Sequence, residues 1–206
     1  LKNKDKLLPL KKDIRTLAVI GPNADNVYNM LGDYTAPQAD GTVVTVLDGI
    51  RQKVSKETRV LYAKGCAVRD SSRTGFKDAI ETARNADAVV MVMGGSSARD
   101  FSSEYEETGA AKVTINQISD MESGEGYDRA TLHLMGRQLE LLEEISRLGK
   151  PVVLVLIKGR PLLMEGAIQE AEAIVDAWYP GMQGGNAVAD VLFGDYNPAG
   201  RLTLSV

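Results

Sequence analysis

One short stretch, Glu122-Ser123-Gly124-Glu125-Gly126-Tyr127-Asp128-Arg129, brings together the residue types that acid catalysis uses. Glu125 stands between two glycines, so the backbone there can take unusual dihedral angles and approach a ligand closely. A carboxyl group presented on such a turn into a cleft is suited to general acid catalysis. Asp128 and Arg129 are expected to join an ion-pair network that fixes the loop, because arginine offers carboxylates a planar fork. The alternative interpretation is an exposed turn beside a surface ion pair.

This stretch lies in a segment of about forty residues, from Gly94 to His133, for which the sequence predicts no long helix or buried strand. Compact domains seldom contain such a loop unless it is functional or disordered. The loop follows the C-terminal end of a predicted strand over residues 88–93, where open α/β sheets form their ligand crevices. It is rich in carboxylates: Asp100, Glu104, Glu106, Glu107, Asp120, Glu122, Glu125 and Asp128. Position and composition together make it the candidate site.

The small numbers of cysteine and histidine residues exclude several other kinds of site. The chain has one cysteine, Cys66, which excludes an internal disulfide and a zinc site built from cysteines. Its one histidine, His133, excludes a multi-histidine metal site, and a Ser-His-Asp triad unless this histidine is the base. Gly21-Pro22-Asn23 follows a predicted strand but fits neither the G-x-G-x-x-G nor the Walker pattern, so it is interpreted as a structural turn.

The elements that must position these residues alternate along the chain. Apolar runs bounded by glycine or proline predict strands over residues 16–20, 59–62, 88–93, 151–157 and 173–177, and 202–206 is a further candidate. Apolar residues at helical spacing predict helices over 46–54, 76–86, 137–148 and 186–193. Continuous β-branched runs indicate strands buried on both faces. The predicted fold is therefore α/β, a mostly parallel sheet with helices on both faces, in a three-layer α/β/α sandwich.

Composition limits the partners. The net charge is −4, so electrostatics give the chain no reason to bind nucleic acid or an anionic membrane. No apolar run approaches the roughly 18–20 residues that span a bilayer. The first twelve residues are charged and lack the apolar core of a signal peptide, which leaves the compartment open if the chain is a fragment.

Motifs distributed over nearly the whole chain resemble the second domain of glycoside hydrolase family 3, the β-glucosidases and β-xylosidases. They are residues 3–10, 17–25 (LAVIGPNAD), 32–34 (GDY), 123–129 (SGEGYDR), 138–142 (QLELL), 178–181 (WYPG), 184–187 (GGNA) and 194–202 (GDYNPAGRL). The resemblance implies an α/β sandwich that docks on a preceding barrel. Residues 1–15 would be a linker from that missing N-terminal barrel, and residues 16–206 would form the C-terminal α/β domain.

The resemblance also implies a function, a domain of a retaining, exo-acting β-glucosidase or β-xylosidase. The glutamate of the family's Ser-Gly-Glu-Gly stretch is its usual general acid/base, a role that carries over to Glu125, with Glu122 three residues earlier as the rival. The nucleophile is an aspartate of the barrel, so the isolated chain is expected to be inactive on its β-linked oligosaccharide or glycoside substrate. Arg99 and Glu104 are candidates for lining the entrance or binding a sugar hydroxyl, and a solvated loop charge is at least as good an interpretation of Glu104.

No metal or organic cofactor is implied by this mechanism. The resemblance suggests a periplasmic or secreted protein. Two functions of other classes remain open, namely a non-catalytic carbohydrate-binding or scaffold module that uses the same loop, and a nucleotide-binding regulator of flavodoxin-like build.

Overall fold

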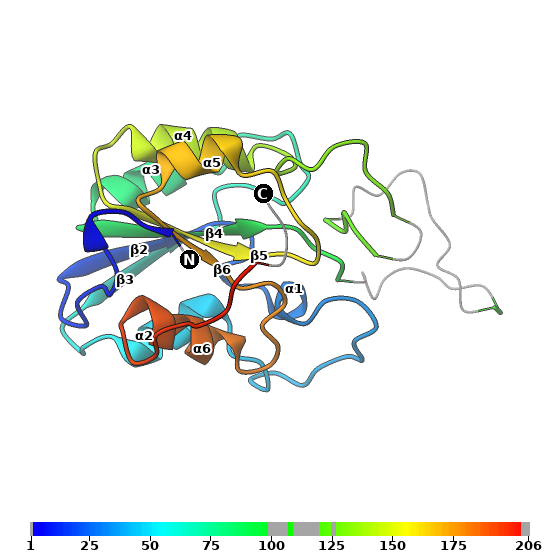
Figure 1. Ribbon diagram of the computed structural model, residues 1–206, viewed down its shortest axis with the longest axis horizontal. Coiled ribbons are helices and arrows are strands. Elements are labelled where there is room, and N and C mark those ends of the chain that lie inside the picture. Colours follow the sequence, from blue (N-terminus) through cyan, green and yellow to red (C-terminus); the bar gives the residue numbers. More distant parts are fainter. Residues whose placement is uncertain (1, 99–106, 109–119, 125–126, 203–206) are drawn as a thin grey trace.

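The computed structural model describes residues 2–98, 107–108, 120–124 and 127–202. Over these residues the fold is the predicted α/β sandwich, a single sheet between two layers of helices (Figure 1). The strands of the sheet are β1 (Lys2–Asn3), β2 (Thr16–Ile20), β3 (Arg59–Ala63), β4 (Ala88–Gly94), β5 (Val152–Ile157) and β6 (Ala173–Asp176). Each predicted strand from residue 16 to residue 177 is confirmed, with ends that differ by at most one residue.

The helices divide between the two faces of the sheet. The helical elements are η1 (Lys4–Lys6), α1 (Val27–Leu31), α2 (Val46–Lys53), α3 (Phe76–Arg84), α4 (Gln138–Ser146), α5 (Glu165–Glu170) and α6 (Gly184–Leu192). Helices α3, α4 and α5 cover one face, and α1, α2 and α6 lie on the other (Figure 1). No helix in the part of the chain that the structure describes is long and apolar enough to cross a membrane.

The strand order indicates where a ligand crevice is expected. The order is β1-β6-β5-β4-β2-β3, and all pairs are parallel except β1 with β6. The chain therefore moves from β2 outward to β3, then crosses back to β4 on the other side of β2. Open α/β sheets bind ligands outside the carboxyl ends of the two strands at such a reversal. The loops that follow β2 and β4 are thus the expected walls of a site.

The N-terminal segment is part of the domain rather than a free tether. Lys2 and Asn3 pair with Ala173 and Ile174 at the edge of the sheet, and the Asn3 side chain hydrogen-bonds both backbone groups of Leu8, each at 2.9 Å. Leu8 is 6% exposed and belongs to the core. The short antiparallel strand covers the open edge of β6, which would otherwise expose unpaired backbone groups. Sequence periodicity did not predict this packing.

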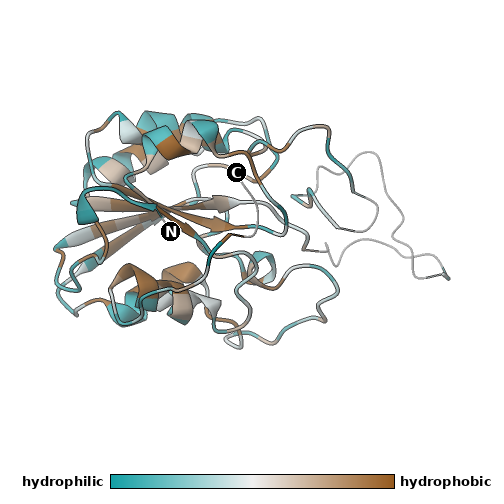
Figure 2. Ribbon diagram, viewed as in Figure 1, coloured by the Kyte–Doolittle hydropathy of each residue, from teal (hydrophilic) through white to brown (hydrophobic). Residues whose placement is uncertain are grey.

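Two cores lie on opposite faces of the sheet because successive side chains of a strand point in opposite directions. Along β5, Val153 packs in the core under α2 and α6, while Leu154 packs in the core under α3, α4 and α5. Both side chains are 0% exposed, which confirms the prediction that this central strand is buried on both faces. Figure 2 shows the same arrangement, with hydrophobic strands between helices whose outer faces are hydrophilic.

Truncating either side chain is expected to destabilise the domain. Val153→Ala or Leu154→Ala should each lower the free energy of unfolding by about 2–4 kcal/mol, because burial is lost and a cavity remains. Urea unfolding of the isolated chain measures this. Leu132, which is 42% exposed, provides a control, since Leu132→Ala should change stability by only about 0.5 kcal/mol. Equal effects of Leu154→Ala and Leu132→Ala would contradict the expectation.

Candidate functional site

The site is built where β4 ends. Gly94 has a φ of 135°, and a β-carbon on it would lie 1.9 Å from the carbonyl oxygen of Ile157, so only glycine fits between the ends of β4 and β5. The Gln138 side chain, 0% exposed at the start of α4, accepts from Gly94 N–H at 2.9 Å and donates to the Gly94 carbonyl at 2.8 Å. The same amide donates to the carbonyl oxygens of Val68 and Met135. One buried glutamine thus fixes the beginning of the long loop.

A second buried network ties the turn after β2 to the same place. The Asn23 amide donates to the carbonyl oxygens of Gly95 at 3.0 Å and Ile157 at 3.2 Å. Asn29 donates to Asn23, and the Ser96 hydroxyl donates to Asn29 at 2.6 Å. Buried side chains therefore join the loops after β2 and β4. These hydrogen bonds fix the carboxyl ends of the two strands relative to each other.

The backbone N–H groups of the turn at residues 21–23 already form hydrogen bonds inside the domain. Gly21 N–H donates to the Ala63 carbonyl, and Asn23 N–H donates to the Val92 carbonyl, each at 3.2 Å. Pro22 has no N–H to offer. Phosphate sites at such turns need free backbone N–H groups. The turn is therefore structural, as predicted, and it gives no support to a nucleotide-binding function.

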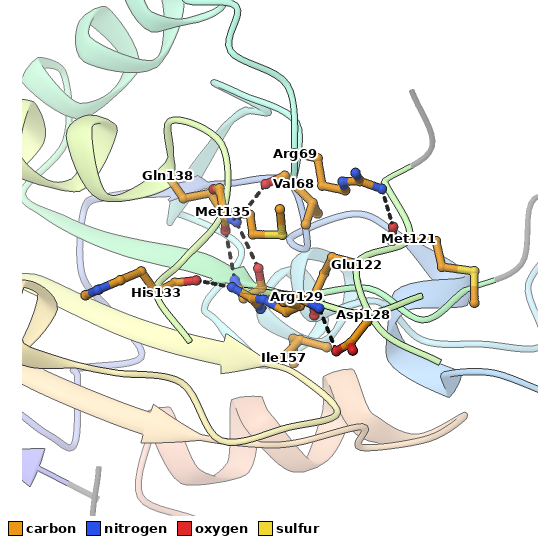
Figure 3. A network of polar contacts seen from close by, with 12 residues as sticks. Val68, Arg69, Met121, Glu122, Asp128, Arg129, His133, Met135, Gln138 and Ile157 are labelled. Atoms are coloured by element: carbon orange, nitrogen blue, oxygen red, sulfur yellow. Dashed lines mark hydrogen bonds and ion pairs between the residues drawn. The ribbon is translucent and has the colours of Figure 1, made fainter. Parts of the chain in front are cut away.

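The far end of the loop is anchored by a reciprocal clamp. Asp120 Oδ1 accepts from the backbone N–H groups of Val68 at 2.9 Å and Arg69 at 3.3 Å. Arg69 in return donates from Nη1 to the carbonyl oxygen of Met121 at 2.8 Å (Figure 3). Charge-assisted bonds of this kind are stronger than neutral ones. The chain that leads into the glutamate-rich stretch is thus fixed to the loop that follows β3.

Glu122, the rival proton donor, is buried in an ion pair. Its side chain is 0% exposed and pairs with Arg129, whose side chain is 3% exposed. The second arm of the Arg129 guanidinium donates to the carbonyl oxygen of His133 (Figure 3). Arg129 therefore takes part in a buried ion pair, as expected, but its partner is Glu122 and not Asp128. Asp128, by contrast, accepts only from the backbone N–H of Arg129 among the hydrogen bonds of the described residues, at 2.7 Å.

The predicted catalytic residue Glu125 lies outside the described residues, and so do Arg99 and Glu104. The residues on either side of Glu125 and Gly126 are described. Tyr127 N–H donates to the carbonyl oxygen of Gly124 at 3.2 Å, so the described residues on either side of Glu125 and Gly126 are bonded to each other. A β-carbon on Gly124 would lie 2.9 Å from a carboxylate oxygen of Asp33, so Gly124 is next to the loop that follows α1.

Buried polar atoms that lack a hydrogen-bond partner cluster where the carboxyl ends of the strands lie. Within the described part of the chain, buried side-chain atoms without a hydrogen-bond partner belong to Ser97, Glu122, Ser123, Arg129, Lys158, Arg160, Asp176 and Tyr179. All of these residues lie at or beyond the carboxyl ends of β4, β5 and β6, or in the loop before α4. Buried polar groups are nearly always paired, so a concentration of exceptions calls for an explanation such as a functional role.

A buried lysine stands out among them. Lys158, directly after β5, is 1% exposed, and its ammonium lies 2.9 Å from Asp176 Oδ2, an ion pair whose angles fall outside hydrogen-bond geometry. The same ammonium lies 4.2 Å from the centroid of the Trp178 ring, within cation–π range. Local sequence gave no sign of this pair, because β5 and β6 become neighbours only in the folded sheet.

The remaining titratable candidates do not join the site. Burial raises the pKa of the Cys66 thiol to about 12, so the thiol stays protonated and is a poor nucleophile at neutral pH. His133 contributes its backbone carbonyl to Arg129. Within the described residues no three histidine, cysteine, aspartate or glutamate side chains come together as metal ligands would.

Comparison with known proteins gives one consistent result. The sequence model of the glycosyl hydrolase family 3 C-terminal domain matches residues 1–206. A β-xylosidase of Formosa agariphila is 42% identical, and a periplasmic β-glucosidase of Salmonella typhimurium is 35% identical, each over 100% of this chain and 26% of its own length. The solved structure of a family 3 exo-β-xylosidase with a xylobiose aziridine probe superposes with a TM-score of 0.78 at 32% identity, over 98% of this chain and 23% of that one. The chain thus spans about a quarter of the length of these relatives.

Proposed function

The chain belongs to glycosyl hydrolase family 3, and from that premise we propose that it is the α/β domain of a retaining, exo-acting β-glycosidase and supplies the general acid/base, Glu125. The proposed substrates of the full-length enzyme are glycosides with a terminal β-linked xylose or glucose. Support comes from the relatives, which are named β-xylosidases and β-glucosidases. The periplasmic relative also supports a periplasmic or secreted location.

The observation that carries the choice of Glu125 is the burial of its rival. Glu122 has a fully buried carboxylate in an ion pair with Arg129. A general acid must come within about 2.6–3.2 Å of the atom that it protonates. A carboxylate that is buried and paired inside the domain is poorly placed to reach a glycosidic oxygen. Glu125, three residues further on between two glycines, has no such constraint from its sequence and lies in the segment that the pair closes.

In the proposed mechanism Glu125 acts twice. It first protonates the oxygen of the leaving group while an aspartate of the preceding barrel attacks the anomeric carbon and forms a glycosyl-enzyme. It then removes a proton from the water that hydrolyses this intermediate, with net retention of configuration. The two carboxyl groups must stand about 5–5.5 Å apart across the scissile bond. This two-carboxylate mechanism uses no metal or organic cofactor.

The unsatisfied polar edge supports the same view of the domain. The residues that carry these atoms lie at the carboxyl ends of β4, β5 and β6 or in the loop before α4, where the loop that carries Glu125 begins and ends. We assign this edge to contact with the barrel and with sugar hydroxyls, to which Arg99 and Glu104 of the same loop would add. Substrate would then be held between two domains of one chain.

The isolated chain is expected to fold and to be inactive. It carries one of the two carboxyl groups that the reaction needs, and acid catalysis cannot replace the nucleophile. A cooperative thermal transition, together with no hydrolysis of aryl β-glucosides or β-xylosides, is the expected result. The full-length enzyme, purified in the same way, is the positive control. Turnover by fragment free of host glycosidases would contradict the proposal.

Kinetics of the full-length enzyme with a change at Glu125 test the identity of the proton donor. The readout is the dependence of the rate on the leaving group, because only substrates with poor leaving groups need protonation. A non-catalytic carbohydrate-binding module would show no such dependence.

A further inference from the structure

Resting on the proposed function, we infer that Glu122 and Arg129 are positioning residues for the proton donor. The two side chains, one before Glu125 in the sequence and one after it, form a buried ion pair (Figure 3). They hold both ends of the segment between them at a fixed separation inside the domain. Their role is to place Glu125 against the glycosidic oxygen, and neither side chain takes part in proton transfer itself.

The segment is closed at two levels. At its base the Glu122 carboxylate meets the Arg129 guanidinium, with side-chain exposures of 0% and 3%. Inside that base, Tyr127 N–H donates to the Gly124 carbonyl at 3.2 Å. Only Glu125 and Gly126 lie between these two inner residues. The ion pair and this hydrogen bond thus hold together the described residues that precede and follow Glu125 and Gly126.

The base is also joined to the rigid sheet. Backbone N–H of Glu122 donates to the Ser96 carbonyl at 2.8 Å, just beyond β4. A β-carbon on Gly95 would lie 2.0 Å from Glu122 Oε1, so the carboxylate occupies the space that any side chain at position 95 would take. Gly95 in turn accepts from the buried Asn23 amide. The carboxylate is therefore seated against the ends of the central strands.

Arg129 extends the connection to the other side of the loop. Its second arm donates to the carbonyl oxygen of His133, on the path to α4, while the first arm holds Glu122 (Figure 3). A lysine at this position has one ammonium and a shorter reach, so it cannot donate to both groups in the planar arrangement of a guanidinium. The requirement for arginine is thus geometric as well as electrostatic.

A positioning role fits the physical chemistry of buried ion pairs. Replacing such a pair by apolar residues of similar size is often neutral or stabilising, so the pair is a weak source of stability. General acid catalysis, however, depends on distance, and a displacement of about 1 Å can lower a rate by about 10²-fold. Buried and bonded on two sides, the Glu122–Arg129 pair provides the geometric control that this distance requires.

The test uses the full-length enzyme with Arg129→Lys and, separately, Glu122→Gln. The value of kcat/KM reports glycosylation and is measured for an alkyl β-glycoside and for a 2,4-dinitrophenyl β-glycoside of the same sugar. We expect both variants to lose about 10²-fold on the alkyl glycoside, which needs a placed proton donor. The dinitrophenyl glycoside, which leaves unprotonated, should change by no more than about 3-fold. Thermal melting, with kinetics recorded well below the transition, confirms that the variants are folded.

Asp190→Asn is the matched control. Asp190 pairs with Lys53 where α2 and α6 end, at the opposite edge of the sheet from the loop. Removing this ion pair should leave both substrates within about 2-fold of the unchanged enzyme. Three results would overturn the inference and assign the pair to a different role. Arg129→Lys and Glu122→Gln could lose activity equally on both substrates, they could lose none on either, or both could fail to fold.

Glu125→Ala, measured alongside, separates this inference from the proposed function. If Glu125→Ala shows leaving-group dependence and the pair variants do not, the positioning role is wrong and the proton donor stands. If Glu125→Ala itself shows no dependence, the proposed function fails and the inference fails with it.

Discussion

Replacing Glu125 by alanine in the full-length enzyme is expected to lower kcat/KM for glycosides with poor leaving groups by about 10²–10⁴-fold. In the proposed mechanism Glu125 protonates the departing oxygen, so in the variant a poor leaving group would have to depart as an unprotonated alkoxide. A 2,4-dinitrophenolate leaves without a proton, and its glycosides should lose far less. The measurement is a series of aryl and alkyl β-glycosides whose leaving groups span a wide range of pKa.

The second half of the reaction gives an independent readout. Hydrolysis of the glycosyl-enzyme lacks its base in Glu125→Ala, so the intermediate should accumulate when the leaving group is good. Azide attacks without a base and should restore turnover, with a β-glycosyl azide as the product. Glu122→Ala should yield no glycosyl azide. If the two variants exchange this behaviour, Glu122 is the acid/base, and if neither yields the azide product, the proton donor lies elsewhere.

Asp176→Ala is expected to lower the unfolding free energy of the domain by about 3–5 kcal/mol. The variant removes the carboxylate 2.9 Å from the Lys158 ammonium. Lys158 is 1% exposed, so its charge cannot reach water without local unfolding. Within the described part of the chain the Trp178 ring, 4.2 Å from the ammonium, is the partner that remains, and it recovers only part of the loss. Urea unfolding of the isolated chain provides the measurement.

Two further variants show whether charge is the cause. The double variant Lys158→Met with Asp176→Leu removes both charges and should recover most of the lost stability. Glu143→Ala breaks an exposed helical pair with Arg147 and should cost about 0.5 kcal/mol or less. A double variant as unstable as Asp176→Ala would show that packing, not an unpaired charge, determines the effect.

Strands and long helices were predictable because their signals are local. Residues 152–157 are continuously apolar, and this run marks a strand buried on both faces wherever its neighbours lie. Lys2–Asn3, α1 and α5 were not predicted. A strand of two residues and helices of five and six are too short to establish a period, and tertiary contacts determine them.

The position of the loop proposed to carry the site could be predicted from the sequence, but the side chains that anchor this loop could not. The position of the carboxylate-rich loop after β4 follows from the strand pattern, and the glycines around Glu125 are visible in the sequence. The buried amides of Asn23 and Gln138 were missed, because the strand ends that they bond, at Ile157 and Gly94, lie 134 and 44 residues away along the chain. For Gln138, a polar residue at the start of an otherwise apolar helix face was the available signal.

The two ends of the long loop are fixed to the domain, whereas the residues between them can vary. Gly94 is held by Gln138, and Asp120 is held by the backbone at Val68 and Arg69. The stretch of chain between these points starts and finishes at positions set by the sheet, whatever its length. Doubling the length of a closed loop costs only about 0.6 kcal/mol in conformational entropy. We therefore expect insertions or substitutions between residues 97 and 119 to leave both anchors, and the folded domain, unchanged.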